Sequence, residues 1–461
     1  MCWDYDSELF LLRKTDSLMA RTLINNGTIL AAEGCYAGYV IFEGDTIREV
    51  GQGAYTERFD GTVINAAGKY VMPGVIDAHV HFREPGLTHK ADWASESAAA
   101  AAGGVTSVFD MPNTNPVTVS LDEVERKAEI AAQKSVVNYS VWLGATNSNL
   151  REITRLNPRE VCGVKLFMGS STGGMLVDDN YTLSGVFAES PVIVSAHCES
   201  EARIAANSAM LKERFPEANA TIHPEVRDAE ACYTSSALAV ELADKYGSRL
   251  NVAHITTARE LALFDEKPLS QKKITAEVTA SHLWFCDEDY PTLGNFIKCN
   301  PSIKNRADRE ALRQTLGRRI DTIATDHAPH TLAEKQNPYW NAPSGMPMIG
   351  HSLAVALELA RMGVMSREMV VRLMCNAPAD LYNISDRGYL RAGCKADIVI
   401  VDPMAEWTVS RENIISKCGW SPLVGTKLSH RVVRTYINGR EVWNGSEICT
   451  DRMGERIVFA R

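Results

Sequence analysis

Long apolar runs and basic clusters are both missing from this sequence of 461 residues. A helix that crosses a bilayer needs about 18–20 consecutive residues that are apolar and uncharged, and no stretch comes near that length. We therefore expect no membrane partner. The formal net charge is −9 and the lysines and arginines form no long run, which argues against a nucleic-acid partner.

Paired cysteines are missing as well. The 11 cysteines are scattered without any Cys-x-x-Cys spacing, which is typical of a reduced protein and not of a disulfide framework. We therefore predict a cytoplasmic location and assign packing roles to Cys162 and Cys198. The first residues are acidic and lack the positive region of a signal peptide, so residues 1–18 are predicted to be a disordered extension.

The two ends of the chain share a β-rich pattern. Residues 19–73 and residues 385–461 contain short apolar runs separated by turn signals, among them Asn26–Gly27, Gly44 and Asn438–Gly439. Such turns favour hairpins, and neither end is long enough to form a large domain alone. We predict that the two ends pair into one small composite β-sandwich domain built from both termini.

The central residues 74–384 have a different texture. Apolar β-branched runs alternate with helical stretches such as Leu121–Lys134 and Asp228–Lys245, which predicts β/α units around a parallel sheet. The eight candidate strands are Val75–Phe82, Val105–Met111, Val136–Leu143, Gly163–Phe167, Val192–Ala196, Leu250–Ile255, Ile274–Leu283 and Thr322–Thr325. The predicted fold is therefore of the α/β class, a (β/α)8 TIM barrel whose chemistry lies at the C-terminal strand ends.

Side chains that bind metals gather at these strand ends. His79 and His81 stand at positions i and i+2 of the first strand, so their side chains point to the same face. His197 and His254 follow the fifth and sixth strands, and Asp326 follows the eighth. Imidazole and carboxylate groups are typical ligands of Zn²⁺ and related ions. Their coincidence at four strand ends predicts a metal site.

Three of these residues have alternative roles that the sequence leaves open. His197 and His254 could each be an ordinary barrel histidine with both ring nitrogens hydrogen-bonded. Asp326 could cap the turn that follows it, since aspartate is common at chain reversals.

Other polar residues near the strand ends are also open to two interpretations. Lys165 lies within the fourth strand, where an ammonium group is costly to bury and cannot bind a metal while protonated; it could instead extend to the barrel rim. Arg83 could clamp a carboxylate through its planar guanidinium or form a surface ion pair. Asn113 could cap a turn.

Seven motifs together resemble those of the cyclic-amidohydrolase branch of the amidohydrolase superfamily. They are Asp77–Gly86, Met111–Thr114, Gly163–Phe167, Ala196–Glu199, Ala253–Thr256, Asn300–Lys304 and Thr325–His330. Within this branch the motifs are most similar to those of the dihydroorotase family. The resemblance extends over residues 20–445, and Leu390–Pro403 is similar to the composite β-sandwich of the family.

The resemblance implies a centre of two Zn²⁺ ions per subunit. The six implied ligands are His79, His81, Lys165, His197, His254 and Asp326. The first two histidines and Asp326 would bind the more buried ion, and the other two histidines the second. Carbon dioxide would convert Lys165 into N6-carboxylysine, an anionic ligand that bridges both ions. Asp326 would also act as the general base and then as the general acid.

The resemblance also implies a substrate and its contacts. Arg83, Asn113 and His330 would hold a substrate carboxylate, and Asn300, Ser344 and Gly345 would contact a pyrimidine ring. The implied reaction is the reversible cyclisation of N-carbamoyl-L-aspartate to L-dihydroorotate and water in de novo pyrimidine biosynthesis. A homodimer or larger homo-oligomer is expected from the same resemblance.

Two other classes of function stay open. An allantoinase or a dihydropyrimidinase (hydantoinase) would use the same metals, but its substrate lacks the carboxylate for which Arg83 and His330 are suited. A non-catalytic homologue that serves as an assembly subunit would be expected to have lost ligands, whereas all six positions are filled here. The segments Asn300–Lys304 and Ser344–Gly350 match the family pattern only approximately.

Overall fold

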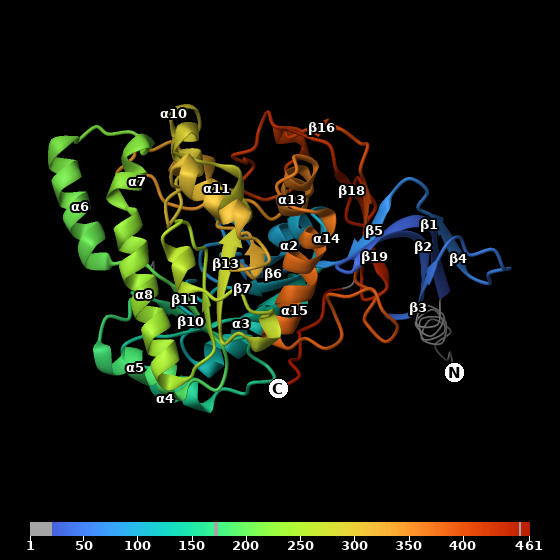
Figure 1. The fold of residues 1–461 in the computed structure, drawn as a ribbon, viewed down its shortest axis with the longest axis horizontal. Helices are drawn as coiled ribbons and strands as arrows, with labels where there is room; N and C mark the ends of the chain where they lie inside the picture. Colours follow the sequence, from blue (N-terminus) through green and yellow to red (C-terminus); the bar gives the residue numbers. More distant parts are fainter. Residues whose placement is uncertain (1–20, 170–173, 451–452) are drawn as a thin grey trace, which may run out of the picture.

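The computed structural model describes residues 21–169, 174–450 and 453–461. The extension predicted for residues 1–18 lies outside these residues. Figure 1 shows two parts, a barrel covered by helices and a β domain beside it. Within the described residues, no helix combines the length and the apolar character that crossing a bilayer requires.

The barrel is made of parallel strands in chain order. They are β6 (Val75–Val80), β7 (Val105–Asp110), β8 (Asn138–Val141), β9 (Leu143–Gly144), β10 (Val164–Phe167), β11 (Val194–His197), β12 (Leu250–Val252), β13 (Ile274–Thr279) and β14 (Thr322–Ala324). Only Trp142 separates β8 from β9, which together correspond to the third predicted strand. The barrel closes where the His81 backbone N–H donates to the His327 carbonyl, at 2.8 Å. The predicted TIM barrel is confirmed.

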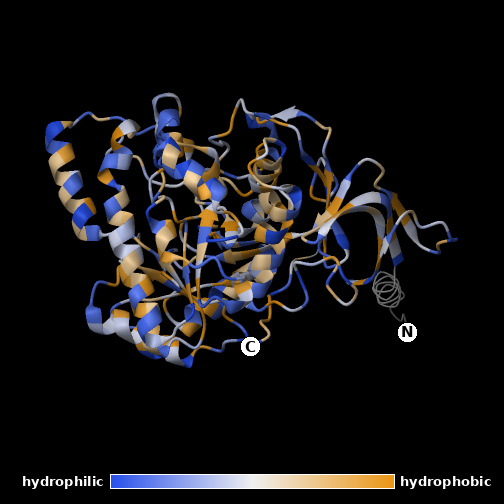
Figure 2. Ribbon diagram, viewed as in Figure 1, coloured by the Kyte–Doolittle hydropathy of each residue, from blue (hydrophilic) through white to orange (hydrophobic). Residues whose placement is uncertain are grey.

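The α-helices lie between and around these strands. They are α2 (Trp93–Ala102), α3 (Leu121–Lys134), α4 (Leu150–Arg155), α5 (Asn180–Glu189), α6 (Glu201–Arg214), α7 (His223–Val226), α8 (Ala229–Tyr246), α9 (Ala280–Trp284), α10 (Tyr290–Leu293), α11 (Arg306–Gln314), α12 (Leu332–Lys335), α13 (Ser352–Arg361), α14 (Arg367–Val371) and α15 (Ala377–Tyr382). Helices α3 and α8 match the predicted stretches. The Ser120 and Asp228 side chains cap their first turns and so fix where these helices begin. Figure 2 shows apolar residues in the central strands and alternating polar and apolar residues along the outer helices α6 and α8.

Several strands are shorter than predicted, and the seventh differs most. The seventh predicted strand was expected to reach Leu283, but β13 ends at Thr279 and α9 follows. The Thr279 hydroxyl accepts a hydrogen bond from the His282 backbone N–H at 3.3 Å and caps this helix. The prediction was wrong because an apolar run does not distinguish a buried strand from a buried helix.

Both ends of the chain contribute to the β domain. Its strands are β1 (Arg21–Ala31), β2 (Gly34–Glu43), β3 (Thr46–Gln52), β4 (Thr62–Asn65), β5 (Tyr70–Pro73), β15 (Ile398–Asp402), β18 (Arg431–Ile437) and β19 (Arg440–Trp443). They form one sheet in the order β19-β18-β15-β5-β1-β2-β3, with β4 also paired to β1. Phe42 of β2 contacts Tyr436 of β18, with ring centroids 5.6 Å apart, so the sheet folds over and encloses a core of its own.

Two of the three predicted turns are hairpin turns. Gly44 lies between β2 and β3, and Asn438–Gly439 joins β18 to β19 with positive φ at both residues. Asn26–Gly27 lies instead inside β1, where its register with β2 shifts at a bulge. A Cβ on Gly27 would be 2.6 Å from the Val71 side chain, so glycine here permits the close approach of β5.

Part of the C-terminal chain packs on the barrel. The segment between β15 and β18 carries the short hairpin of β16 (Trp407–Thr408) and β17 (Lys427–Leu428). The last described stretch, residues 453–461, runs beside β8, where the Tyr139 backbone N–H donates to the Glu455 carbonyl at 3.0 Å. Residues 385–461, predicted as the second half of the sandwich, therefore also cover the barrel.

Candidate active site

The twelve residues predicted for the site line one cavity of about 220 Å³ at the C-terminal ends of the barrel strands. They are His79, His81, Arg83, Asn113, Lys165, His197, His254, Asn300, Asp326, His330, Ser344 and Gly345. A larger cavity of about 370 Å³ lies between α2, α13 and the C-terminal segment, but it is lined by none of these twelve residues. We therefore locate the candidate site in the smaller cavity.

The histidines of β6 converge on one carboxylate. His79 Nδ1 lies 2.7 Å from Glu277 Oε1, and this contact leaves His79 Nε2 3.4 Å from Asp326 Oδ1. His81 Nδ1 lies 2.7 Å from Asn113 Oδ1, while its Nε2 lies 2.9 Å from the same Asp326 oxygen. Each ring thus uses Nδ1 for a supporting contact and turns Nε2 to Asp326, as metal-binding histidines do.

A second pair of imidazoles faces the cavity from β11 and β12. His197 Nε2 lies 2.9 Å from Glu199 Oε2, and its Nδ1 lies 3.0 Å from His254 Nε2. Arg227 also donates to Glu199, and it lowers the pKa of that buried carboxyl although burial alone would raise it. Burial lowers the pKa of His197, which favours the neutral ring that binds metals. The two facing nitrogens are suited to binding one ion together.

Lys165 of β10 is buried at the floor of the cavity. Its Nζ has no hydrogen-bond partner within the described parts of the chain, and the residue is only 1% exposed. Burial lowers the pKa of this amine to about 8. An unpartnered ammonium group in such a place is costly. A neutral amine is also the form that reacts with carbon dioxide, so the environment suits the predicted modification.

Asp326 completes the candidate metal ligands. Ligand atoms of His79, His254 and Asp326 all lie within 4.8 Å of one another, a group that could hold a metal ion. Burial alone would raise the pKa of the Asp326 carboxyl, but His79 and His81 hold it well below its usual range. The carboxylate is therefore ionised, and this set of nitrogen and oxygen donors suits Zn²⁺ and similar ions.

Arg83 forms another wall of the cavity. Its Nε donates to the Pro329 carbonyl at 2.9 Å, and its Nη2 lies 3.1 Å from His330 Nε2. Among the described residues no carboxylate forms an ion pair with this guanidinium. Burial lowers the pKa of Arg83 to about 10, so the group keeps its positive charge at neutral pH. A buried guanidinium that faces a cavity without an acidic partner suits an anionic ligand.

His330 lies between Arg83 and the loop that closes the cavity. Lys90 Nζ lies 3.0 Å from His330 Nδ1, and His330 Nε2 lies 3.0 Å from the Ser344 carbonyl. Burial, Arg83 and Lys90 all lower the pKa of this imidazole, so the ring is neutral. A neutral ring has one accepting nitrogen, so it accepts either from Lys90 at Nδ1 or from Arg83 at Nε2 and not from both.

The remaining predicted contacts come from two loops. Asn300 Oδ1 is buried without a hydrogen-bond partner in the described structure, which leaves it available to a ligand. Gly345 has a φ of 135°, and a Cβ at this position would lie 2.5 Å from the Ala328 carbonyl. Lys335 Nζ donates to the Gly345 carbonyl at 2.8 Å and holds this loop in place.

Sequence reasoning missed the residues that support the site. Glu277 lies in the middle of β13, and its only signal was a carboxylate within an apolar strand. Glu199 stands two residues after His197 and offered no separate signal. Arg227, Lys90 and Lys335 lie in helical or loop segments, and nothing in their local sequence indicates that they support residues of the site.

Comparison with known proteins decides the family. The model of the amidohydrolase family matches residues 70–442. The chain belongs to the amidohydrolase family. This confirms the predicted family.

Proteins named dihydroorotase and a solved hydantoinase structure resemble this chain over most of its length. The dihydroorotase of Halobacterium salinarum is 36% identical over 411 residues, which cover 88% of this chain and 93% of that protein. The dihydroorotase of Methanothermobacter thermautotrophicus is 32% identical over 392 residues, covering 84% and 86%. The structure of L-hydantoinase (dihydropyrimidinase) from Arthrobacter aurescens superposes with a TM-score of 0.90 at 24% identity, covering 96% of this chain and all of that one. The last similarity shows the fold.

Proposed function

We propose that this amidohydrolase is a zinc-dependent dihydroorotase that interconverts N-carbamoyl-L-aspartate with L-dihydroorotate and water in pyrimidine biosynthesis. The observation that carries the proposal is the buried guanidinium of Arg83 beside His330, which faces the cavity without an acidic partner among the described residues. Dihydroorotate has a carboxylate to pair with it. The archaeal relatives named dihydroorotase support the same activity.

The metal centre of the proposal consists of two Zn²⁺ ions. Its six ligands would be His79, His81, Lys165, His197, His254 and Asp326, with Lys165 as N6-carboxylysine. The unpartnered Nζ of Lys165 and the inward-facing ring nitrogens support this ligand set. Zinc ions bound there would polarise a ring carbonyl and lower the pKa of a water molecule to about 7. Mn²⁺ or Co²⁺ would accept the same ligands.

Asp326 has the position and the charge of the proton carrier. Its ionised carboxylate lies at the centre of the cavity, where it can accept a proton from the attacking water and then donate it to the leaving amide nitrogen. Arg83 and His330 would hold the substrate carboxylate at the opposite wall. These contacts would orient the ring so that its amide carbonyl faces the metal ligands.

The same contacts of Arg83 and His330 would discriminate between substrates. A ring without a carboxylate would leave the Arg83 guanidinium desolvated and unpaired, which costs about 1–3 kcal/mol. Allantoin and dihydrouracil lack the carboxylate. The second candidate function, a hydantoinase, is favoured by the similarity of the fold to L-hydantoinase. A shared barrel is compatible with several substrates, so Arg83 is the stronger guide to the substrate.

Ring opening by the zinc-loaded protein tests the proposal. The assay compares L-dihydroorotate, allantoin and dihydrouracil in parallel, with zinc content measured on the same sample. We expect a strong preference for dihydroorotate. Preference for an uncharged ring would overturn the substrate and keep the metal chemistry. A protein without bound zinc and without activity on any ring would favour the non-catalytic alternative.

Two further properties belong to the proposal. The substrate is a small molecule, in keeping with a cavity of about 220 Å³. A homodimer or larger homo-oligomer and a cytoplasmic location stay predictions from the sequence. Sedimentation of the purified protein tests the oligomeric state.

A further inference from the structure

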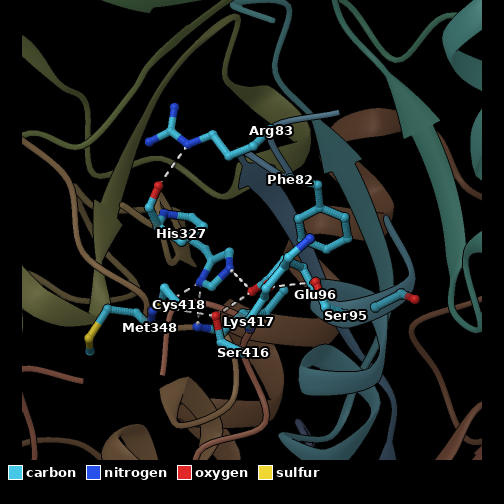
Figure 3. Close-up of polar contacts among 12 residues, drawn as sticks. Phe82, Arg83, Ser95, Glu96, His327, Met348, Ser416, Lys417 and Cys418 are labelled. Carbon is cyan, nitrogen blue, oxygen red and sulfur yellow. Dashed lines mark hydrogen bonds and ion pairs between the residues drawn. The ribbon is translucent and has the colours of Figure 1, made fainter. Parts of the chain in front are cut away.

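A buried carboxylate outside the cavity joins three distant segments of the chain. Glu96 of α2 is fully buried, and its Oε2 lies 2.7 Å from His327 Nε2 and accepts from Ser416 Oγ at 2.6 Å. Its Oε1 accepts from the Lys417 backbone N–H at 3.0 Å and from Ser95 Oγ at 2.9 Å. Figure 3 shows these contacts around Glu96. One carboxylate thus holds α2, the loop after β14 and the C-terminal segment together.

The ring of His327 is held at both nitrogens. Its Nδ1 accepts from the backbone N–H groups of Met348 and Ile349, at 3.1 and 3.3 Å. The ring proton therefore lies on Nε2, and Nε2 donates to Glu96. A ring with a fixed partner on each side cannot rotate, so Glu96 determines the position of the residue directly after Asp326.

The backbone around His327 needs such support. Asp326 has a φ of 49°, a conformation that costs a residue with a side chain about 1–2 kcal/mol. Strain of this kind persists only where the surroundings hold it. The His327 carbonyl accepts from the His81 backbone N–H at 2.8 Å, so the support also reaches the end of β6.

The C-terminal segment supports the other end of the same loop. We name residues 416–420 the C-terminal strap. Trp420 Nε1 donates to the His330 carbonyl at 2.7 Å, and Lys417 Nζ donates to the Thr88 carbonyl and to Asp92, both at 2.7 Å. Glu96 holds the first two residues of this strap. The loop from Asp326 to His330 is therefore fixed from α2 and from the strap.

We propose that Glu96 is a positioning residue, which acts through His327 and the C-terminal strap to orient Asp326 and His330. The kinetic part of this inference rests on the proposed function, because it assigns a role to residues outside the cavity in the same reaction. It makes the C-terminal segment, which follows the barrel in the sequence, part of the support of the active site.

A matched carboxylate separates positioning from simple anchoring. Glu358 of α13 is 4% exposed, and it accepts from the Ser429 hydroxyl at 2.6 Å and from the Ser429 backbone N–H at 3.2 Å. It therefore anchors the same C-terminal segment by the same chemistry. Among the described residues its other hydrogen-bond partner is Arg361, which does not line the cavity.

The experiment compares Glu96→Gln with Glu358→Gln in the full chain. Each variant is loaded with Co²⁺, and we measure kcat, KM, the urea midpoint of unfolding and the visible spectrum of the bound cobalt. We expect Glu96→Gln to lower kcat about 10- to 100-fold, because displaced catalytic groups lose rate steeply, and to change the cobalt spectrum. Glu358→Gln should keep the wild-type kcat and spectrum even if both variants lose stability.

Two results would overturn the proposal. One is a Glu96→Gln protein with the wild-type spectrum and kcat. The other is an equal loss in both variants that follows the urea midpoint. If Glu96→Gln does not fold, Ser416→Ala removes one hydrogen bond from Glu96 and should shift the spectrum, and Ser416→Thr should restore it; an unshifted spectrum contradicts the proposal. If the wild-type protein opens none of the three rings, the proposed function fails, but the cobalt spectra still decide whether Glu96 positions Asp326.

Discussion

Arg83 carries a permanent positive charge on the wall of the active-site cavity, and among the described residues no carboxylate pairs with it. A buried cation destabilises a fold unless hydrogen bonds or a ligand compensate for its lost hydration. The Pro329 carbonyl accepts from Nε, and Nη2 lies 3.1 Å from His330 Nε2, but neither group carries a negative charge. The positive charge of the guanidinium group is therefore best explained by an anionic substrate.

Substitution of Arg83 by methionine tests this explanation. The side chain keeps an unbranched apolar stem and loses the charged guanidinium, so Arg83→Met should lower kcat/KM for dihydroorotate by about 1.5–3 kcal/mol, roughly 10- to 150-fold. The loss should appear mainly in KM. Zinc content should equal that of the wild type, because Arg83 contacts none of the proposed ligands directly. A variant purified without zinc would contradict this separation of roles.

The lysine at the floor of the cavity supports a second prediction. Lys165→Ala removes the proposed bridging ligand, so we expect loss of bound metal and of activity. The shortened side chain leaves space in which acetate or formate can supply the missing carboxylate. Partial recovery of activity with added acetate and zinc, measured on dihydroorotate, would support the carboxylysine. Full activity without any added acid would exclude a bridging role for Lys165.

Lys165 was implied as a ligand only by the family resemblance. The other proposed ligands were predictable from sequence because each lies at the end of an apolar strand, and the C-terminal ends of parallel strands meet at one end of a barrel. Their supporting residues were not, because these contacts depend on the tertiary fold. His79 and Glu277 are separated by 198 residues in the sequence, and only barrel closure brings them together. Local patterns describe neighbours along the chain and contain no signal for such a pair.

At the scale of elements, the loops after the strands contain unusual backbone. Arg83, His254 and Asp326 have φ values of 67°, 38° and 49°, although none is glycine or asparagine. Aspartate and histidine are enriched at positive φ but adopt it at only a few positions, and arginine is not enriched there, so residue type alone does not predict these conformations. All three residues line the cavity, and the packed loops around them hold the strain.

Two errors of the strand prediction have a common physical origin. Asn26–Gly27 is predicted as a hairpin turn but lies at a bulge inside β1. A glycine that permits a turn also permits close packing against Val71. Ala280–Leu283 are predicted as the end of a strand, but they form α9, which the last strand residue, Thr279, caps. In both cases the same residue chemistry suits two local structures, and tertiary contacts decide between them.

The loop after β6 offers a prediction at this scale. Gly86 has a φ of 82°, and a Cβ there would lie 1.9 Å from the Asn115 carbonyl. Gly86→Ala should therefore force apart the loops that carry Arg83 and Asn113, and lower both the urea midpoint and kcat/KM. Gly68→Ala is the matched control, because Gly68 has a φ of 74° but open space around its Cβ position.

The control should lose only the cost of the backbone conformation, about 1–2 kcal/mol, and should keep the wild-type kcat/KM. Equal losses of stability and unchanged kinetics in both variants would show that the contact with Asn115 does not constrain the site.

At the scale of the whole molecule, the barrel is stabilised by residues that follow it in the sequence. The alternation of strands and helices predicted the barrel, and the two β-rich ends predicted a domain composed of both. The packing of residues 453–461 on the barrel had no signal, because a short irregular stretch has no periodicity from which burial can be inferred. Its role follows only from its contacts.

Phe459 allows a test of that role. It is fully buried against Phe109 of β7, with ring centroids 5.8 Å apart, and its backbone N–H donates to the Arg159 carbonyl near the N-terminal ends of the strands. Phe459→Ala should lower the free energy of unfolding by about 3–5 kcal/mol, because it leaves a cavity in this core. Val458→Ala is the matched control, since Val458 is 56% exposed and its substitution should cost little stability.

The active site lies at the opposite ends of the strands, so kcat of the zinc-loaded Phe459→Ala protein should equal that of the wild type at temperatures where it stays folded. A loss of kcat in the folded variant would mean that the C-terminal stretch supports the chemistry as well as the fold.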